Sequence, residues 1–169
     1  ILTGEEVWCQ GFSEPAHGSD LAAIELEAER RGDEYLLNGQ KIWSTHAQLA
    51  DWCFVLARTE ETESKFDGIT AFLVDMDQEG IMTEPIRQIT DDHGFNQTFF
   101  DDAVARPEHV VGEEGAGWET AMTLVAFEHS SSGTWGLEVR LDELDEFCQT
   151  HRRDGRLLSD VPRVRRKLA

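Results

Sequence analysis

The chain has 169 residues, of which 40% are hydrophobic and 29% are charged. This balance is typical of a folded globular domain and excludes wholesale disorder, and every apolar run falls well short of the roughly 20 residues of a transmembrane helix. Acidic side chains outnumber basic ones by 34 to 15, which gives a net charge of −19. So acidic a protein repels phosphate backbones and anionic membranes, and we therefore expect neither a nucleic-acid nor a membrane partner.

The first hundred residues predict a series of short strands. Runs rich in β-branched and aromatic residues, separated by turn residues, are typical of an antiparallel barrel or sandwich. Gly32-Asp33 predicts one turn, and Asn38-Gly39 predicts a tight hairpin because both of its residues tolerate positive φ. Pro85 predicts that the run 81–89 lies at a sheet edge or contains a bulge, because proline lacks the N–H that a central strand needs. The predicted strands cover residues 24–30, 34–37, 40–43, 52–59, 68–74, 81–89 and 98–104.

The periodicity changes after the glycine-rich segment 112–117. This segment predicts a turn before a helix rather than a phosphate-binding loop, because neither GxGxxG order nor a Lys-Ser/Thr pair accompanies it. Apolar residues then recur at helical spacing. We expect a helix that is broken or softened near Gly133 and Gly136 and ended by Gly155, and a further helix that starts within 161–169.

These elements predict an α+β fold, in which an antiparallel β-barrel or sandwich is followed by antiparallel helices that form an incomplete helical bundle. The expected domain boundaries are 1–112 for the β-domain and 113–169 for the start of the helical domain. Because the last helix stops midway and the chain begins at Ile1, we expect a piece of a longer protein.

The cysteines and histidines predict no metal site. Cys9, Cys53 and Cys148 show neither a disulfide framework nor zinc-ligand spacing, and the six histidines lie far apart. Cysteines without a disulfide pattern are typical of a reducing compartment, so we expect a cytoplasmic protein.

Two segments contain side chains suited to a ligand. In 10–20, a strand opens at Pro15 into a loop of small residues, which exposes N–H groups and hydroxyls. In 38–45, Trp43 and Thr45 lie two residues apart on an extended chain. An indole that can stack on a flat ring would then share a side with a hydroxyl that can bond the edge of that ring. An ordinary turn and a core tryptophan are the alternative interpretations.

Five separated blocks resemble the acyl-CoA dehydrogenase family in order and spacing: GFSEPAHGSD, NGQKIWST, ADWCFVLART, GITAFLVDM and QTFFDDAVARPEHVVGEEGAGWETAM. The resemblance implies the central β-domain of that family and the start of its C-terminal helical domain. It implies an enzyme that uses FAD to dehydrogenate an acyl-CoA thioester, with a proton leaving Cα and a hydride passing from Cβ to flavin N5. It also implies an electron-transfer flavoprotein as electron acceptor and a homo- or hetero-oligomer, either a dimer or a tetramer.

The resemblance also implies roles for individual residues. Trp43 packs on the flavin ring, Thr45 bonds its edge near N5, and Ser13 bonds the isoalloxazine. Ser19 faces the coenzyme A arm of the substrate. Glu128 occupies the position that a minority of the family uses for the catalytic base, whereas most members carry this base in a later segment. The complete set of expected FAD contacts is Gln10, Phe12, Ser13, Trp43, Ser44 and Thr45.

Three positions depart from the family pattern. His129 stands where an arginine is frequent, and His151 and Asp154 stand where an Arg-x-x-Phe-Gly motif places its Arg and Phe. Losing the arginine charge and gaining an acid would weaken a pyrophosphate contact. Two alternatives therefore stay open: a non-catalytic or flavin-poor partner subunit of a heteromeric dehydrogenase, and an acyl-CoA oxidase or flavin monooxygenase of the same superfamily.

Overall fold

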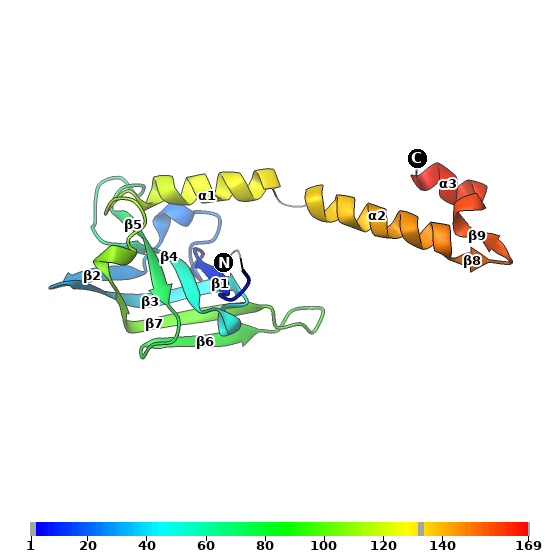
Figure 1. The fold of residues 1–169 in the computed structure, drawn as a ribbon. Helices are drawn as coiled ribbons and strands as arrows, with labels where there is room; N and C mark the ends of the chain where they lie inside the picture. Colours follow the sequence, from blue (N-terminus) through cyan, green and yellow to red (C-terminus); the bar gives the residue numbers. More distant parts are fainter. Residues whose placement is uncertain (1–2, 132–133, 169) are drawn as a thin grey trace. The chain divides into compact units, whose positions relative to one another are not determined.

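The computed structural model describes residues 3–131 and 134–168 (Figure 1). The chain divides into two compact units, Ile1–Leu124 and Val125–Ala169, and their boundary falls within helix α1 (Gly117–Ser131). Within the described residues, every helix is too short or too polar to cross a lipid bilayer.

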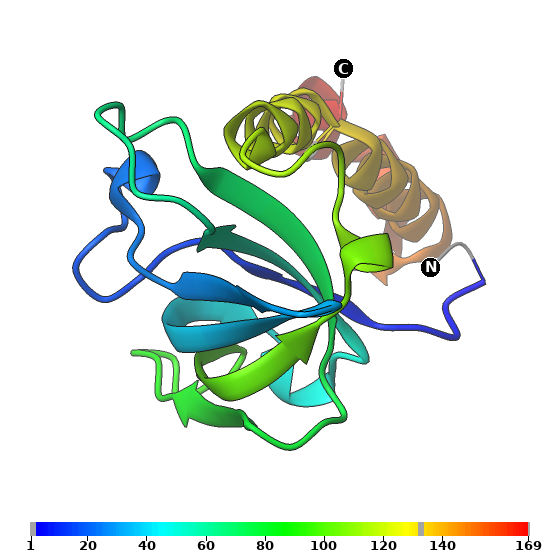
Figure 2. The same ribbon diagram turned by 90° about the vertical axis from the view of Figure 1, so that its left-hand side faces the viewer.

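The first unit is a curled seven-stranded sheet (Figure 2). Its strands are β1 (Trp8–Gly11), β2 (Glu27–Arg31), β3 (Glu34–Thr45), β4 (Trp52–Arg58), β5 (Ile69–Asp75), β6 (Ile81–Ile86) and β7 (Phe95–Ala105). Their order is β1-β4-β2-β3-β7-β6, and β5 pairs with β4. The α+β class is confirmed. Pro85 lies in the edge strand β6, as predicted.

The sheet is mixed rather than wholly antiparallel. Strands β1 and β2 both run parallel to β4, whereas the other pairs are antiparallel. The long segment 12–26 joins β1 to β2, so no tight turn forces these two strands to pair with each other. Strand β4 inserts between them and becomes the centre of the unit.

The predicted hairpin at Asn38-Gly39 is wrong, whereas the turn at Gly32-Asp33 is confirmed. Strands β2 and β3 pair across Gly32-Asp33, and β3 continues through Asn38 and Gly39. Asp102 on β7 explains why, because its backbone N–H and its carboxylate each bond the Asn38 amide at 2.9 Å. The register of β3 with β7 shifts at this point: Leu37 pairs with Ala103 and Gly39 with Phe100, so the extra residue of this bulge lies on β7, opposite Asn38.

Two hydrophobic clusters fill the unit on either side of β4. Cys53, Val55 and Ala57 point into the larger cluster, whereas Leu56 belongs to the smaller one beneath α1. All four side chains are buried. Strand β4 is therefore covered on both faces, which explains its continuous apolar sequence.

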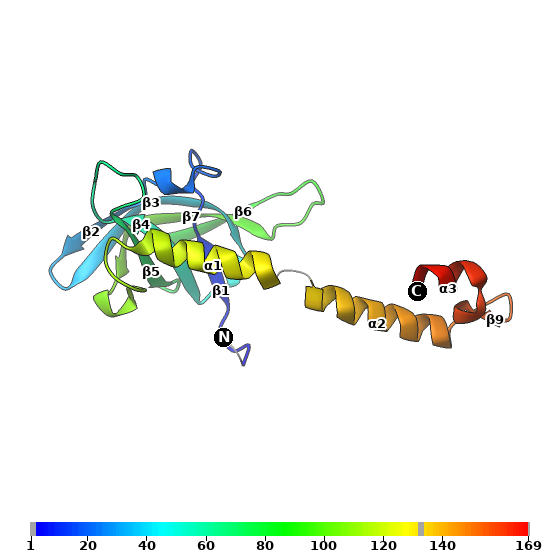
Figure 3. The same cartoon turned by 90° about the horizontal axis from the view of Figure 1, so that it is seen from above.

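The first turn of α1 docks on β5 through its glycines (Figure 3). The N–H of Gly115 donates to Thr70 Oγ1 at 2.8 Å, and Ala116 forms a β-bridge with Ile69. A Cβ on Gly117 would lie 2.6 Å from the backbone of β5, which only glycine avoids. The glycine-rich segment is a turn before a helix, as predicted.

The second unit contains α2 (Thr134–Thr150), a hairpin of β8 (Arg152–Arg153) and β9 (Arg156–Leu157), and α3 (Pro162–Leu168). The predicted helix within 161–169 is confirmed. Gly133 lies outside the described residues, and Gly136 lies inside α2 rather than at a break.

The helix end predicted at Gly155 is wrong. Helix α2 ends at Thr150, and Gly155 instead forms the two-residue turn between β8 and β9 with Asp154. Their φ values are 78° and 52°, and two consecutive positive values are the signature of a tight hairpin.

We predict that Gly117→Ala destabilises the full-length protein by about 1–3 kcal/mol, because the new methyl group must displace the β5 backbone. Gly136→Ala is the matched control, since a Cβ there meets no atom within 4 Å and alanine favours a helix. Thermal unfolding of both variants measures the difference. Equal melting temperatures would show that α1 does not depend on this close approach.

Candidate functional site

Trp43 is the extra residue of a β-bulge in β3. Its neighbours Ile42 and Ser44 pair with Gln97 and Asn96, so Trp43 has no partner on β7. Its φ of 64° lies in the left-handed region, which costs a bulky residue about 1–3 kcal/mol. Bulges re-aim side chains and are frequent beside active sites.

The bulge turns the Trp43 indole outward. The side chain is 55% exposed, so it is not a core tryptophan. Phe95 meets it edge-on, with ring centroids 6.2 Å apart and an interplanar angle of 88°. Among the described residues no aromatic ring stacks parallel to the indole, so its flat surface is suited to a planar ligand.

Ser44 and Thr45, which follow Trp43, differ in burial. Thr45 is exposed like Trp43, whereas Ser44 is only 1% exposed. The hydroxyl oxygen of Ser44 is buried, and it makes no hydrogen bond to any residue that the structure describes. Of Ser44 and Thr45, both predicted to contact the ligand, only Thr45 lies on the surface.

The segment after β1 crosses β3 next to the bulge. The Ile42 N–H donates to the Ser13 carbonyl at 2.8 Å, and Lys41 Nζ donates to the Phe12 carbonyl at 3.1 Å. These bonds bring Phe12 and Ser13 beside the residues that precede Trp43. The structure thus brings together the two segments that the sequence singled out.

In the sequence, Gln10 precedes the Phe12-Ser13 segment and Ser19 follows it. Gln10 is half-buried on β1, where its register partner is Phe54 of β4. Ser19 is exposed in the loop between β1 and β2.

A buried ion pair anchors the loop that begins at Glu14. Lys41 Nζ lies 2.7 Å from Glu14 Oε1, and the two side chains are 0% and 5% exposed. The Glu14 carboxylate also accepts the backbone N–H groups of Glu25 at 2.6 Å and Leu26 at 2.9 Å. Burial lowers the pKa of Lys41 to about 8, although the Glu14 carboxylate opposes this effect.

A cavity of about 300 Å³ borders the same loop. His17 lines it, with Nε2 3.3 Å from Glu25 Oε1. The rest of the lining comes from the loop, from the entry to β2 and from β3: Glu14, Pro15, Ala16, Glu25, Leu26, Gly39 and Gln40.

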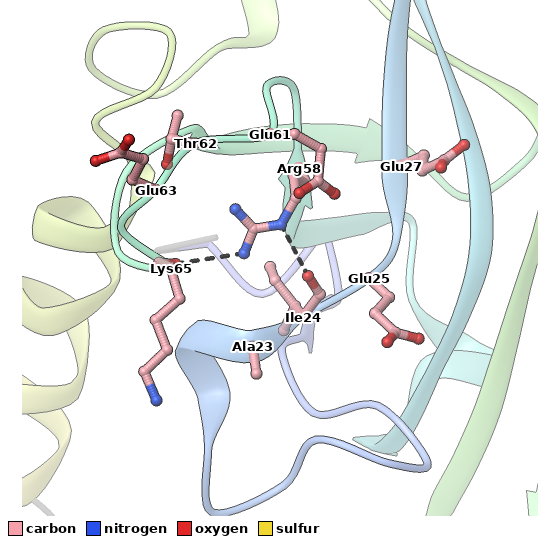
Figure 4. A pocket seen from close by; sticks show the side chains of 9 residues that line it. All are labelled: Ala23, Ile24, Glu25, Glu27, Arg58, Glu61, Thr62, Glu63 and Lys65. Carbon is pink, nitrogen blue, oxygen red and sulfur yellow. Dashed lines mark hydrogen bonds between the residues drawn. The ribbon is translucent and has the colours of Figure 1, made fainter.

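A second cavity, of about 570 Å³, is lined by none of the residues of the predicted site (Figure 4). Arg58 reaches into it, but its guanidinium donates to the backbone carbonyls of Ala22, Ile24, Lys65 and Asp67 at 2.9–3.3 Å. The guanidinium is therefore already engaged in hydrogen bonds to backbone carbonyls. Four glutamates also line the cavity, so it is unsuited to an anionic ligand: Glu25, Glu27, Glu61 and Glu63.

Glu128 and the positions that depart from the family pattern lie in the second unit. Glu128 and His129 are exposed on α1. The His151 ring stacks on Phe147 of its own helix end, with centroids 3.8 Å apart. Asp154 is exposed in the turn between β8 and β9.

Sequence reasoning missed the roles of Glu14, Lys41 and Arg58. A signal for Lys41 was available, because it follows the inward alternation of Tyr35 and Leu37 along β3. A lysine at an inward position needs a buried carboxylate, and Glu14 was the acid in the adjacent ligand segment. The bonds of Arg58 to carbonyls of distant loops leave no such local pattern.

Comparison with known proteins identifies the class to which this fold and these segments belong. Residues 9–103, more than half of the chain, match the acyl-CoA dehydrogenase middle domain. The chain therefore belongs to the acyl-CoA dehydrogenase family, which confirms the resemblance seen in its sequence.

Individual relatives support the same family assignment. Over 163 residues the chain is 44% identical to the acyl-CoA dehydrogenase IpdE1 of Mycobacterium tuberculosis, covering 96% of this chain and 42% of that protein. The solved structure of the steroid ACAD Tcur3481-Tcur3483 matches with a TM-score of 0.76 and 31% identity, covering 99% of this chain and 42% of the other. A glutaryl-CoA dehydrogenase from Mycobacterium smegmatis in complex with FADH2 matches with a TM-score of 0.67 and 27% identity, covering 98% and 42%. The chain spans less than half the length of these relatives.

We predict that Glu14→Gln and Lys41→Met each destabilise the full-length protein by about 3–5 kcal/mol, because each leaves one buried charge without its partner. The double variant should cost clearly less than the two single costs added together, since it leaves neither charge behind. Chemical denaturation of the four proteins gives this coupling energy. Additive costs would mean that the pair contributes no specific interaction.

Proposed function

We propose that this chain forms the flavin-facing part of an acyl-CoA dehydrogenase, which oxidises an acyl-CoA thioester between Cα and Cβ. The observation that carries the proposal is Trp43, an exposed indole held in a strained bulge beside the Ser13 segment. Membership of the family supports it, as does a structural neighbour in complex with FADH2.

The residues at the bulge fit a flat, polar ring system. In this proposal the Trp43 indole stacks on the ring of FAD, and the Thr45 and Ser13 hydroxyls bond its edge. Gln10, Phe12 and Ser44 add contacts through their backbone, since the Ser44 hydroxyl is buried. FAD, when bound, supplies the redox chemistry by accepting a hydride from the substrate.

The substrate contacts fall on the loop and on α1. Ser19 binds the coenzyme A arm through its exposed hydroxyl, because the loop presents it to solvent. Glu128 takes the α-proton on its carboxylate oxygen. A carboxylate is a stronger base in a dry surrounding, so in this proposal the bound acyl group excludes water from it.

The proposal extends to partners. Acyl-CoA is the substrate, an electron-transfer flavoprotein receives the electrons, and the enzyme is a homo- or hetero-oligomer. An oxidase of the same superfamily would instead pass electrons to O₂, so peroxide release during turnover distinguishes the two.

A flavin-poor partner subunit is the second candidate function. The observation in its favour is that the His151 ring is stacked on Phe147 and that Asp154 brings a negative charge to the neighbouring turn. A residue that binds the pyrophosphate of FAD across a dimer interface needs a free positive charge instead. Purified full-length protein that is colourless and inactive with acyl-CoA, and active only beside a second subunit, would support this candidate.

Trp43→Ala in the full-length protein should release flavin or shift its visible absorption, because the stacking surface is lost. Trp8→Ala is the control, since Trp8 stacks on Trp52 with centroids 5.7 Å apart and has no proposed flavin contact. Absorption spectra and flavin content after gel filtration provide the measurement. Full flavin content and an unchanged spectrum in Trp43→Ala would refute the assignment.

Glu128→Gln should lower the turnover of acyl-CoA by about 10²–10⁴-fold while flavin stays bound, because the amide cannot accept the α-proton. Glu138→Gln, an exposed acid on α2, should keep the wild-type rate. Steady-state assays with an artificial electron acceptor compare the variants. A near-normal rate for Glu128→Gln would assign the base to another carboxylate.

A further inference from the structure

Two cysteines face each other across neighbouring strands. In the parallel pairing of β1 with β4, Cys9 is the register partner of Cys53. The adjacent partners Trp8 and Trp52 stack their rings, so partners in this register project their side chains to the same side. Cys9 and Cys53, one residue further along, therefore share the opposite, buried side, where both belong to the larger hydrophobic cluster.

The spacing of the strands suits a bond between the two sulfurs. Neighbouring strands lie about 4.8 Å apart, and the Cα atoms of a disulfide are usually about 4.4–6.8 Å apart. Gly11 leaves space beside Cys53, because a Cβ on Gly11 would lie 3.2 Å from the Cys53 sulfur. The Cys53 side chain therefore leans toward β1, the strand that carries Cys9.

The two thiols differ in acidity. A hydrogen bond from the Cys53 thiol lowers the pKa of Cys9 against the opposing effect of burial. The same hydrogen bond, together with burial, raises the pKa of Cys53. A lowered pKa favours the thiolate, which is the nucleophilic form of cysteine. Cys9 also lies on an edge strand, whereas Cys53 lies in the centre of the sheet.

We propose that Cys9 and Cys53 form a site of reversible oxidation that closes into a disulfide when the protein meets hydrogen peroxide. This site needs no flavin and does not depend on the proposed enzymatic activity. A thiol with a resolving partner beside it is the arrangement that converts a sulfenic acid into a disulfide.

The oxidation takes place in two balanced steps. The Cys9 sulfur attacks one peroxide oxygen, an S–O bond forms as the O–O bond breaks, and the thiol proton leaves with the departing hydroxide as water. Cys9 is then a sulfenic acid, and the peroxide has accepted two electrons. The Cys53 sulfur next attacks the Cys9 sulfur, an S–S bond replaces the S–O bond, and the Cys53 proton leaves with the hydroxide as a second water.

Peptide mapping of the reduced full-length protein tests the proposal. The protein is treated with increasing hydrogen peroxide, its remaining thiols are alkylated after denaturation, and the digest is analysed by mass spectrometry. We expect a peptide pair linked through Cys9 and Cys53, with the loss of two free thiols per chain, and its disappearance after dithiothreitol. Cys148 is the internal control, because it is as buried as Cys9 but lies on α2 without a neighbouring cysteine.

Two variants define the order of events. Cys53→Ser should trap Cys9 as a sulfenic acid that reacts with dimedone, whereas Cys9→Ser should leave Cys53 as a free thiol. The proposal is overturned if wild-type Cys9 and Cys53 remain alkylated thiols at peroxide doses that oxidise Cys148. It is equally overturned if wild-type Cys9 accumulates as an unlinked sulfinic or sulfonic acid. Both results come from wild-type protein, so neither depends on how well a variant folds.

Discussion

The buried ion pair between Glu14 and Lys41 determines the path of the chain around the candidate site. One carboxylate binds the ammonium of β3 and two backbone N–H groups at the entry to β2. Three segments that are distant in the sequence therefore meet at a single side chain. The Glu14 carboxylate therefore positions the two ends of the loop 14–26, while Arg58 binds the carbonyls of Ala22 and Ile24 between them.

This arrangement also explains how the sheet tolerates a charged interior. An isolated charge inside a protein is costly, and attraction between two charges offsets the cost only when further hydrogen bonds satisfy them. Glu14 has these further partners, and Lys41 gains the carbonyl of Phe12. The lowered pKa of Lys41 shows that desolvation still outweighs attraction for the cation. The pair thus contributes to a defined loop position more than to net stability.

The sequence predicts those parts of the fold that depend on neighbouring residues. The turn at Gly32-Asp33 and the turn before α1 depend on Gly32 and Gly115, whose positive φ values are a local backbone preference of glycine. Asn38-Gly39 has the same local preference as a hairpin, but hydrogen bonds to Asp102 of β7 keep it within a strand. A distant partner overrides a local signal there, and the sequence does not reveal such partners.

The candidate site, like the fold, could be predicted from the sequence only in part. The sequence identified Trp43 and Thr45 as ligand-facing by simple strand alternation, whereas the structure exposes Trp43 through a bulge. Both side chains are exposed, but a bulge rather than strand alternation is what exposes Trp43. Ser44 shows the limit of motif reasoning, because its place in the motif does not reveal that its hydroxyl is buried.

Arg58 has a consequence for the motions of the first unit. Its guanidinium holds the carbonyls of Ala22 and Ile24 on one loop and those of Lys65 and Asp67 on another. Each loop makes its own hydrogen bonds to this guanidinium, so one side chain links the two loops. Local opening of one loop removes partners from the side chain that also binds the other, so the local stabilities of the two loops are coupled through Arg58.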